Sequence, residues 1–509
     1  MSARIVKWII WIAMGFLFLA GAASVLLLWS FKASETSTIG QINFKNRLHI
    51  PKLLTPKIDQ QGKKVFDLTF REGEMEFVEG KRTKTWGINA PYLAPTIRVA
   101  RGDKVQMNVT NRTGETTTLH WHGMILPAQM DGGPHQLIEP GQTWSPHWQI
   151  DQPAATTWFH PHLHGKTAEH VYRGAAGMLI IDDEKSKRLP LPKTYGVDDI
   201  PLIVQDKSFQ NDGSLSRDSK FFSNVGILGD EILVNGTHQP YFEATTNLIR
   251  FRVLNGSNSR VYHFRFDDRR DFHLIATDSG LLESPQKMNQ LLLSPGERAE
   301  IIVNVSPGER VVLQSRDVDL GGPFWLASYN GGNDEFDILQ IRASQRLKQL
   351  PALPKNMVHV QWPEQKQVTK TRSFIMTSHD MINEKKMDMN RIDEVVTAGS
   401  TEIWEVSNPR DDMYHNFHIH GVHFEILQLD GNKPPSRYRG LKDTLYLAPQ
   451  STATLLVRFA NYADERFPYM YHCHILLHED QGMMGQFLVV KPGVHPPRKR
   501  KAIDQHASH

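Results

Sequence analysis

The sequence has very little cysteine, little net charge and little sign of helix. Cys473 is the only cysteine among 509 residues, so a disulfide framework within the chain is excluded. Lys and Arg number 58 against 55 Asp and Glu, and a net charge of +3 gives no indication of a polyanionic partner such as nucleic acid. After residue 35 no long stretch has the apolar spacing of a helix, whereas short alternating stretches between turn residues are frequent.

The one long apolar run lies at the N-terminus. The 24 residues from Trp8 to Phe31 carry no charge; Arg4 and Lys7 precede them and Lys32 follows. This run is longer than the core of a cleaved signal peptide and long enough to span a bilayer. We interpret residues 1–35 as an uncleaved signal anchor, with a removed signal peptide as the alternative. In both cases the body is exported to the periplasm or another extracytoplasmic space, and the basic flank places the N-terminus in the cytoplasm.

The single cysteine stands between two histidines, in His472-Cys473-His474, with His478 and Met483 downstream. In an extended strand neighbouring side chains point to opposite faces, so the two flanking histidines share one face and Cys473 points to the other. Thiolate, imidazole and a weak axial thioether are the ligands of a blue-copper centre. The Cys473 face still lacks one imidazole.

Three further histidine clusters occur in the chain: His120-Trp121-His122, His160-Pro161-His162 and His415-Asn416-Phe417-His418-Ile419-His420. By the same parity His418 and His420 share a strand face, and His415 points to the opposite one beside Cys473. Any one pair among 24 histidines has a plain explanation as a surface or core residue. Four pairs, one of them around the only cysteine, indicate metal binding.

The motifs HWHG, HPHLHG, HNFHIHG and HCHILLHEDQGMM resemble the multicopper oxidases in order and spacing, over nearly all of the chain after its N-terminal segment. The resemblance implies four copper ions. Type 1 copper would be bound by His415, Cys473 and His478, with Met483 as the axial ligand. Type 2 copper would be bound by His120 and His418. The type 3 copper pair would be bound by His122, His160, His162, His420, His472 and His474.

A weak repeat divides the body into three parts. Each copy has a strand that ends at an asparagine and a later strand preceded by a proline. The pairs are Asn111 with Pro140, Asn255 with Pro295, and Asn408 with Pro449, and the prolines are 155 and 154 residues apart. Together with the resemblance, the repeat predicts an all-β fold of three consecutive cupredoxin-like Greek-key β-sandwich domains after the N-terminal segment.

The expected domains cover residues 44–190, 198–345 and 372–492, with a linker over 346–371 and a tail over 493–509. At the positions of the histidine pairs, the second copy carries neither pair. Domains one and three must therefore face each other and share the cluster, with four histidines from each, while domain two serves as a spacer. We expect the body to be monomeric.

Reduction of O2 to water consumes four electrons and also protons, which carboxylates deliver. Asp131, before Gly132 and Gly133, resembles the proton-relay acid of the family, and a turn-forming aspartate is an equal alternative. Glu479 is the second candidate. Strand parity would turn it away from His478 and toward the cluster, an argument that a helix at this position would invalidate.

The reductant is expected to bind beside His415, where Asp411, Asp412 and Met413 precede it. Carboxylate and thioether suit a cuprous ion, and Met376 opens a second group of methionines. This resembles the periplasmic cuprous oxidases that confer copper tolerance, although their long Met- and His-rich insertion in domain three is absent. We expect oxidation of cuprous or ferrous ions coupled to O2, with laccase-type oxidation of phenols or aromatic amines as the alternative. A non-catalytic cell-envelope or copper-binding relative is the second alternative, and such a relative would lack several of these histidines.

Overall fold

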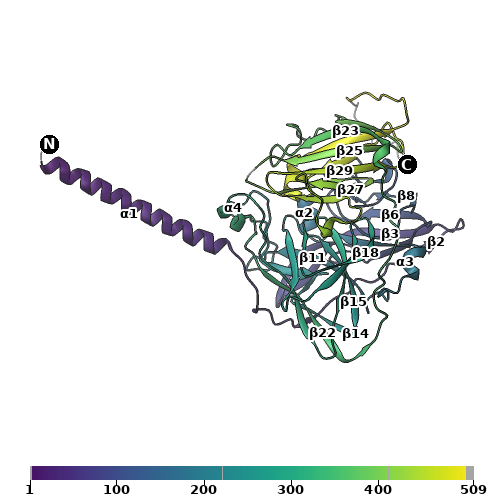
Figure 1. Cartoon of the computed structure of the whole chain (residues 1–509), viewed down its shortest axis with the longest axis horizontal. Coiled ribbons are helices and arrows are strands. Elements are labelled where there is room, and N and C mark those ends of the chain that lie inside the picture. Colours follow the sequence, from purple (N-terminus) through teal and green to yellow (C-terminus); the bar gives the residue numbers. More distant parts are fainter. Residues whose placement is uncertain (1–2, 221, 411, 500–509) are drawn as a thin grey trace.

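The computed structural model describes residues 3–220, 222–410 and 412–499. A long helix, α1 (Ala3–Ser34), projects from a body of β-sheets (Figure 1). Its segment Arg4–Ala22 is long and apolar enough to cross a membrane, judged by length and composition. The other described helices have five or six residues: α2 (Thr167–Tyr172), α3 (Glu184–Arg188), α4 (Phe324–Tyr329) and α5 (Leu476–Gln481). Single 3-10 turns are η1 (Ala128–Met130), η2 (Gln365–Gln367) and η3 (Ser436–Tyr438).

The first sandwich packs a six-stranded sheet against a three-stranded one around Trp121, Phe66 and Phe159. The larger sheet contains β2 (Lys57–Ile58), β3 (Lys64–Val78), β4 (Lys81–Ile88), β6 (Lys104–Asn111), β7 (Thr143–Trp144) and β8 (His147–Gln149). The smaller contains β5 (Ile97–Ala100), β10 (Gly177–Asp182) and β9 (Ala155–Phe159). All five residues of β9 are buried, which fixes the position of the histidines that follow it.

The second sandwich has a six-stranded and a seven-stranded sheet. The six strands are β1 (Asn46–Arg47), β14 (Pro240–Thr246), β22 (Phe336–Lys348), β21 (Arg310–Ser315), β16 (Tyr262–Phe266) and β19 (Leu291–Leu293). The seven are β13 (Thr237–His238), β12 (Glu231–Val234), β11 (Asp199–Lys207), β15 (Leu248–Asn255), β20 (Arg298–Asn304), β17 (Phe272–Thr277) and β18 (Gly280–Met288). β1 falls inside the range expected for the first domain, yet it pairs with β14 and so extends the second sandwich.

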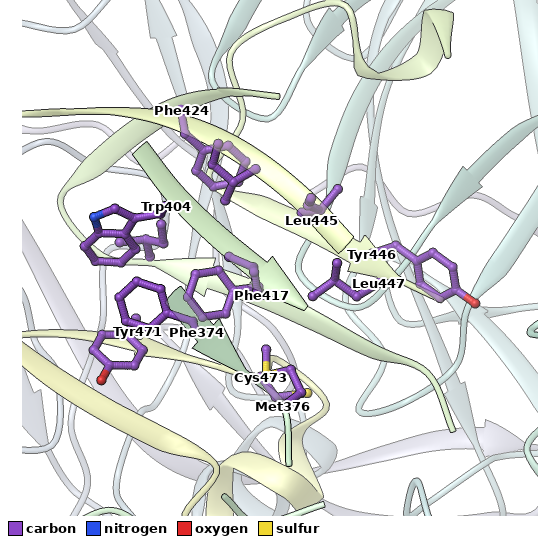
Figure 2. Packing of buried hydrophobic residues seen from close by; sticks show 14 of the residues in the cluster. Phe374, Met376, Trp404, Phe417, Phe424, Leu445, Tyr446, Leu447, Tyr471 and Cys473 are labelled. Atoms are coloured by element: carbon purple, nitrogen blue, oxygen red, sulfur yellow. The ribbon is translucent and has the colours of Figure 1, made fainter. Parts of the chain in front are cut away.

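The third sandwich pairs a four-stranded with a five-stranded sheet. The four strands are β23 (Val368–Ile375), β25 (Thr401–Asn408), β29 (Ser451–Phe459) and β27 (Val422–Leu429). The five are β24 (Glu394–Thr397), β31 (Met484–Val490), β30 (Tyr469–His472), β26 (His415–Ile419) and β28 (Thr444–Leu447). Its core is aromatic: the Phe374 ring lies 4.3 Å from that of Trp404 and 4.8 Å from that of Tyr471 (Figure 2). Cys473 and Met376 belong to the same buried cluster.

The repeated asparagines have one structural role in all three sandwiches. Each is fully buried at the end of its strand, where its side-chain amide donates to a backbone carbonyl at the start of the proline segment. The partners are Ile138 for Asn111 (2.8 Å), Leu293 for Asn255 (2.9 Å) and Ala448 for Asn408 (3.1 Å). Because a buried amide needs such partners, the repeat reflects a turn that every copy must build. This all-β architecture with its N-terminal apolar helix confirms the predicted fold class.

Candidate metal centre

Eight histidines from the first and third sandwiches meet in one buried cluster, each with at most 1% of its surface exposed. In the first sandwich His120 and His160 exchange two backbone hydrogen bonds of 2.8 and 3.1 Å. In the third, His418 of β26 pairs directly with His472 of β30. Each pairing fixes two chain segments side by side, so the histidines two residues further along are held on the same faces. The second sandwich contributes none of the eight.

The eight rings divide into smaller groups whose ligand atoms lie within 4.8 Å of one another. The groups are His120 with His122 and His418, His122 with His160 and His474, and His162 with His420 and His472. In the last group the Nε2 atom of His472 lies 3.2 Å from the Nε2 atoms of both partners. This grouping fits two three-histidine positions and one two-histidine position, the division that the resemblance implies.

Hydrogen bonds orient most of these rings with Nε2 facing inward. The Nδ1 atoms of His120, His418 and His472 lie 2.8–3.0 Å from backbone carbonyl oxygens, a contact that places the proton on Nδ1. The Nε2 atoms of His120 and His418 are buried and have no hydrogen-bond partner. Burial lowers the pKa of His472 to about 3, so its imidazole is neutral at physiological pH. Neutral imidazoles with unpartnered, converging nitrogens fit a site for copper.

A second site surrounds the cysteine. The Cys473 Sγ atom lies 3.6 Å from Nδ1 of His415 and 3.6 Å from Nδ1 of His478. Met483 is fully buried and is tied to the same loop, because its carbonyl accepts from the Cys473 amide at 3.1 Å. Burial raises the pKa of the Cys473 thiol to about 12. A bound cation reverses that effect and holds the thiolate, so this donor set also fits copper.

The two proposed proton donors both lie against the histidine cluster. Asp131 follows η1, and its Oδ2 atom is 2.7 Å from Nδ1 of His420 and 3.5 Å from Nδ1 of His120. Gly132 follows with φ +78°, a conformation that places its backbone directly against Leu119. The aspartate therefore forms a turn and also contacts two histidines, so the two interpretations of Asp131 do not exclude each other.

Glu479 lies near the cluster for a different reason than strand parity. It belongs to the helix α5, which invalidates the parity argument. Its carboxylate oxygens nevertheless lie 3.2 Å from Nδ1 of His162 and 3.3 Å from Nδ1 of His472. Burial raises the pKa of Glu479 well above its ordinary value, which favours the protonated form of the carboxyl group.

Two polar groups of the site were not predicted from the sequence. Asn416 accepts from Cys473 Sγ at 3.5 Å and from the His474 amide at 2.5 Å, and its own amide donates to Pro295 of the second sandwich at 2.9 Å. Asn416 lies inside the HNFHIHG motif, and this position could have identified it as a residue of the site. It joins both metal sites to the spacer domain.

The second unpredicted group is Asp443, which lies 3.1 Å from Nε2 of His122. Arg298 of β20 holds this carboxylate with two hydrogen bonds of 2.6 and 2.7 Å, and both side chains are fully buried. The neighbouring Lys442 pairs with Asp278 at 2.8 Å. No motif spacing marks Asp443, because its partners come from all three sandwiches.

Of the residues expected to bind the reductant, the methionines are buried and one aspartate is partly exposed. Met376 is completely buried and Met413 is 3% exposed. The Asp412 carboxylate is partly exposed and is bound by Arg410, whose hydrogen bond lowers the pKa of that carboxyl. Asp411 lies outside the described residues. His415 and His478 are themselves buried, and the exposed ring of His379 lies 6.4 Å from that of His478.

Comparison with known proteins gives consistent matches. Two family models, both described as multicopper oxidase, match residues 69–186 and 358–493. Multicopper oxidase mco of Staphylococcus epidermidis is 37% identical over 460 residues, which cover 89% of this chain and 95% of that protein. Cell division protein FtsP of Xenorhabdus nematophila is 37% identical over 445 residues, 86% of this chain and 92% of that protein. The crystal structure of a laccase from Pediococcus acidilactici is similar with a TM-score of 0.80 at 33% identity, covering 88% of this chain and 94% of that one.

Proposed function

We propose, because this chain belongs to the multicopper oxidase family, that it couples one-electron oxidation of a reductant to four-electron reduction of O2 to water. The observation that carries the proposal is the segment His472-Cys473-His474, which puts the thiol in one site and its two neighbours in the other. Four copper ions bound there would supply electron acceptance at Cys473 and O2 reduction at the histidine cluster. The backbone on each side of Cys473 connects the thiol directly to His472 and His474 and so provides a covalent route between the sites.

Protons for water formation are assigned to Asp131 and Glu479. Both carboxyls touch the Nδ1 side of cluster histidines, at 2.7 Å for Asp131 with His420 and 3.2 Å for Glu479 with His162. Burial raises the pKa of Glu479 and so favours the protonated form that a proton donor needs. Glu479 also lies in α5, directly after His478, so the same short helix holds a ligand of one site and the acid of the other.

For the reductant we propose a cuprous or ferrous ion. The partly exposed, ionised Asp412 and the exposed imidazole of His379 offer oxygen and nitrogen donors near the buried His415 and His478. A second candidate is a phenol or aromatic amine, and two observations favour it. The thioethers of Met376 and Met413 are buried, and one of the similar structures is a laccase.

A non-catalytic role is the remaining alternative, since FtsP is similar over most of its length. A non-catalytic relative is expected to lack several of the residues that would bind copper. Here all ten histidines, Cys473 and Met483 are present and buried in two converging sites, which supports catalysis. We further propose that α1 keeps the body at the outer face of the cytoplasmic membrane.

Oxygen uptake by the full-length, copper-loaded protein tests this proposal, with Cu(I), Fe(II) and a simple phenol compared at equal concentration. The double variant Asp412→Asn with His379→Ala should reduce metal-ion oxidation by about tenfold and leave phenol oxidation unchanged. Glu405→Gln, on the exposed face of β25, is the matched control for loss of one acid in the same domain. Faster oxidation of phenol with no effect of the double variant would identify a laccase. No oxygen uptake with copper bound would overturn the catalytic proposal.

A further inference from the structure

The end of α1 is fixed to one particular side of the body. The hydroxyl groups of Ser30 and Tyr329, the last residue of α4, lie 2.7 Å apart. After the helix, the Thr36 amide donates to Asp334 at 2.8 Å, and Lys220 donates both to the Ser34 carbonyl at 2.5 Å and to Asp334 at 2.9 Å. These bonds join the helix to α4 and to the segment that begins at Lys220.

That same segment leads directly to the cysteine site. The Phe222 ring lies 5.0 Å from the Tyr329 ring, in an edge-to-face contact. Two residues further on, the Asn224 carbonyl oxygen lies 2.9 Å from Nε2 of His478, whose Nδ1 faces Cys473. Two residues span at most about 7.6 Å of backbone. His478 of the cysteine site and the end of α1 are therefore linked through one short segment.

The hydrocarbon boundary of a membrane would fall at this level. The uncharged run from Trp8 to Phe31 is about 36 Å long as a helix, slightly more than the roughly 30 Å of a bilayer core. Its last turn contains Ser30, the residue bonded to α4. Lys32, exposed in the final turn, then lies at the depth of the lipid headgroups.

The surface at this level carries an exposed aromatic ring, of the kind that concentrates at membrane interfaces. Phe222 is 48% exposed, and no other Phe, Tyr or Trp after α1 is among the exposed hydrophobic residues of the described part of the chain. Figure 1 shows α4 beside the end of α1 and β2 on the opposite side of the body.

We propose that the side of the body formed by α4 and residues 222–226, here called the membrane face, rests on the bilayer that holds α1. Resting on the proposed function, this inference means that the reductant reaches His478 and Cys473 from the membrane surface. The membrane face thereby limits access by bulky water-borne reductants and gives the advantage to small ones that gather at the lipid headgroups.

The test uses the full-length, copper-loaded protein in phosphatidylcholine vesicles. An environment-sensitive fluorophore is attached through Phe222→Cys, or through Ser223→Cys if the first variant does not fold; the native Cys473 is fully buried and does not react. Ile58→Cys is the matched control, because Ile58 is 61% exposed in β2 on the opposite side (Figure 1). Fluorescence is compared between vesicles with brominated and ordinary acyl chains, a ratio that cancels quenching by copper.

The proposal predicts at least about twofold quenching by brominated lipid at position 222 or 223 and no change at position 58. No quenching at the first positions, or equal quenching at position 58, would overturn it. Oxygen uptake in the same vesicles separates the two claims. Quenching without oxygen uptake refutes only the proposed function, whereas oxygen uptake without quenching refutes only the membrane face.

Discussion

Arg298 of the spacer domain supports the histidine cluster through the Asp443 carboxylate. It donates to both oxygens of Asp443 at 2.6 and 2.7 Å, to the Thr156 carbonyl at 3.0 Å and to the Asp278 carbonyl at 2.8 Å. The substitution Arg298→Met keeps much of the volume and removes the charge. It leaves the Asp443 carboxylate buried beside His122 with its main cation lost.

The expected loss of unfolding free energy in the Arg298→Met variant follows from the cost of leaving a buried charge without its partner. Breaking a buried ion pair on one side costs about 3–5 kcal/mol of unfolding free energy. For a domain of this size such a loss lowers Tm by roughly 6–20 °C. Because Asp443 also contacts His122 and, through its carbonyl, His418, we expect copper affinity at the position between His120 and His418 to fall by about tenfold or more.

The assay combines calorimetry of the first unfolding transition with copper retained after dialysis against a chelator. Arg252→Met is the matched control, because Arg252 is equally buried and pairs with Asp199 at 2.6 Å and Glu300 at 2.7 Å, away from the histidines. It should lower Tm to a similar extent without loss of copper. A change of less than about 1 kcal/mol in the Arg298 variant, or equal copper loss in both variants, would refute the reasoning.

Three further predictions concern single positions. Asp131→Asn should slow oxygen reduction by about 100-fold, while reduction of the blue copper under anaerobic conditions, followed by its visible absorption, keeps its rate; slowing of both rates would argue against a proton role. Gly132→Ala should cost about 1–2 kcal/mol for its φ of +78° and more for a Cβ atom 1.7 Å from the Leu119 carbonyl oxygen, so that soluble yield drops; normal yield would contradict the geometry. Burial lowers the pKa of Lys207 to about 7 from 10.5, so between these values the unfolded chain binds a proton that the folded chain lacks. The unfolding free energy should therefore rise by roughly 2 kcal/mol from pH 7 to pH 9, and Lys207→Met should remove this rise in a thermal titration.

The sequence was sufficient for the fold class, through the repeat and the family resemblance, and for the separation of the Cys473 face from that of the neighbouring histidines, through strand parity. Strand parity around Cys473 separates its face from that of His472 and His474, and the structure has the same separation. The repeat of buried asparagines marks the same corner in each sandwich. These features need no knowledge of distant contacts.

Other features depend on packing between segments that are far apart in the chain. Asp443 and Arg298 are 145 residues apart, and nothing in either segment indicates their contact. Burial of Met376 and Met413 is likewise a property of the folded core, so the exposed thioether site expected from the sequence is not formed by these two residues. Glu479 reaches the cluster through a helix turn, although strand parity was the reason for predicting it.

The central claim is complete reduction of oxygen by electrons that enter through the Cys473 site. Its most direct test is the ratio of reductant oxidised to oxygen consumed by the full-length protein, with copper content and hydrogen peroxide measured in the same sample. The account predicts four bound copper ions, four one-electron equivalents per O2 and no peroxide. Two equivalents per O2 with release of peroxide, or no oxygen uptake by fully loaded protein, would contradict it.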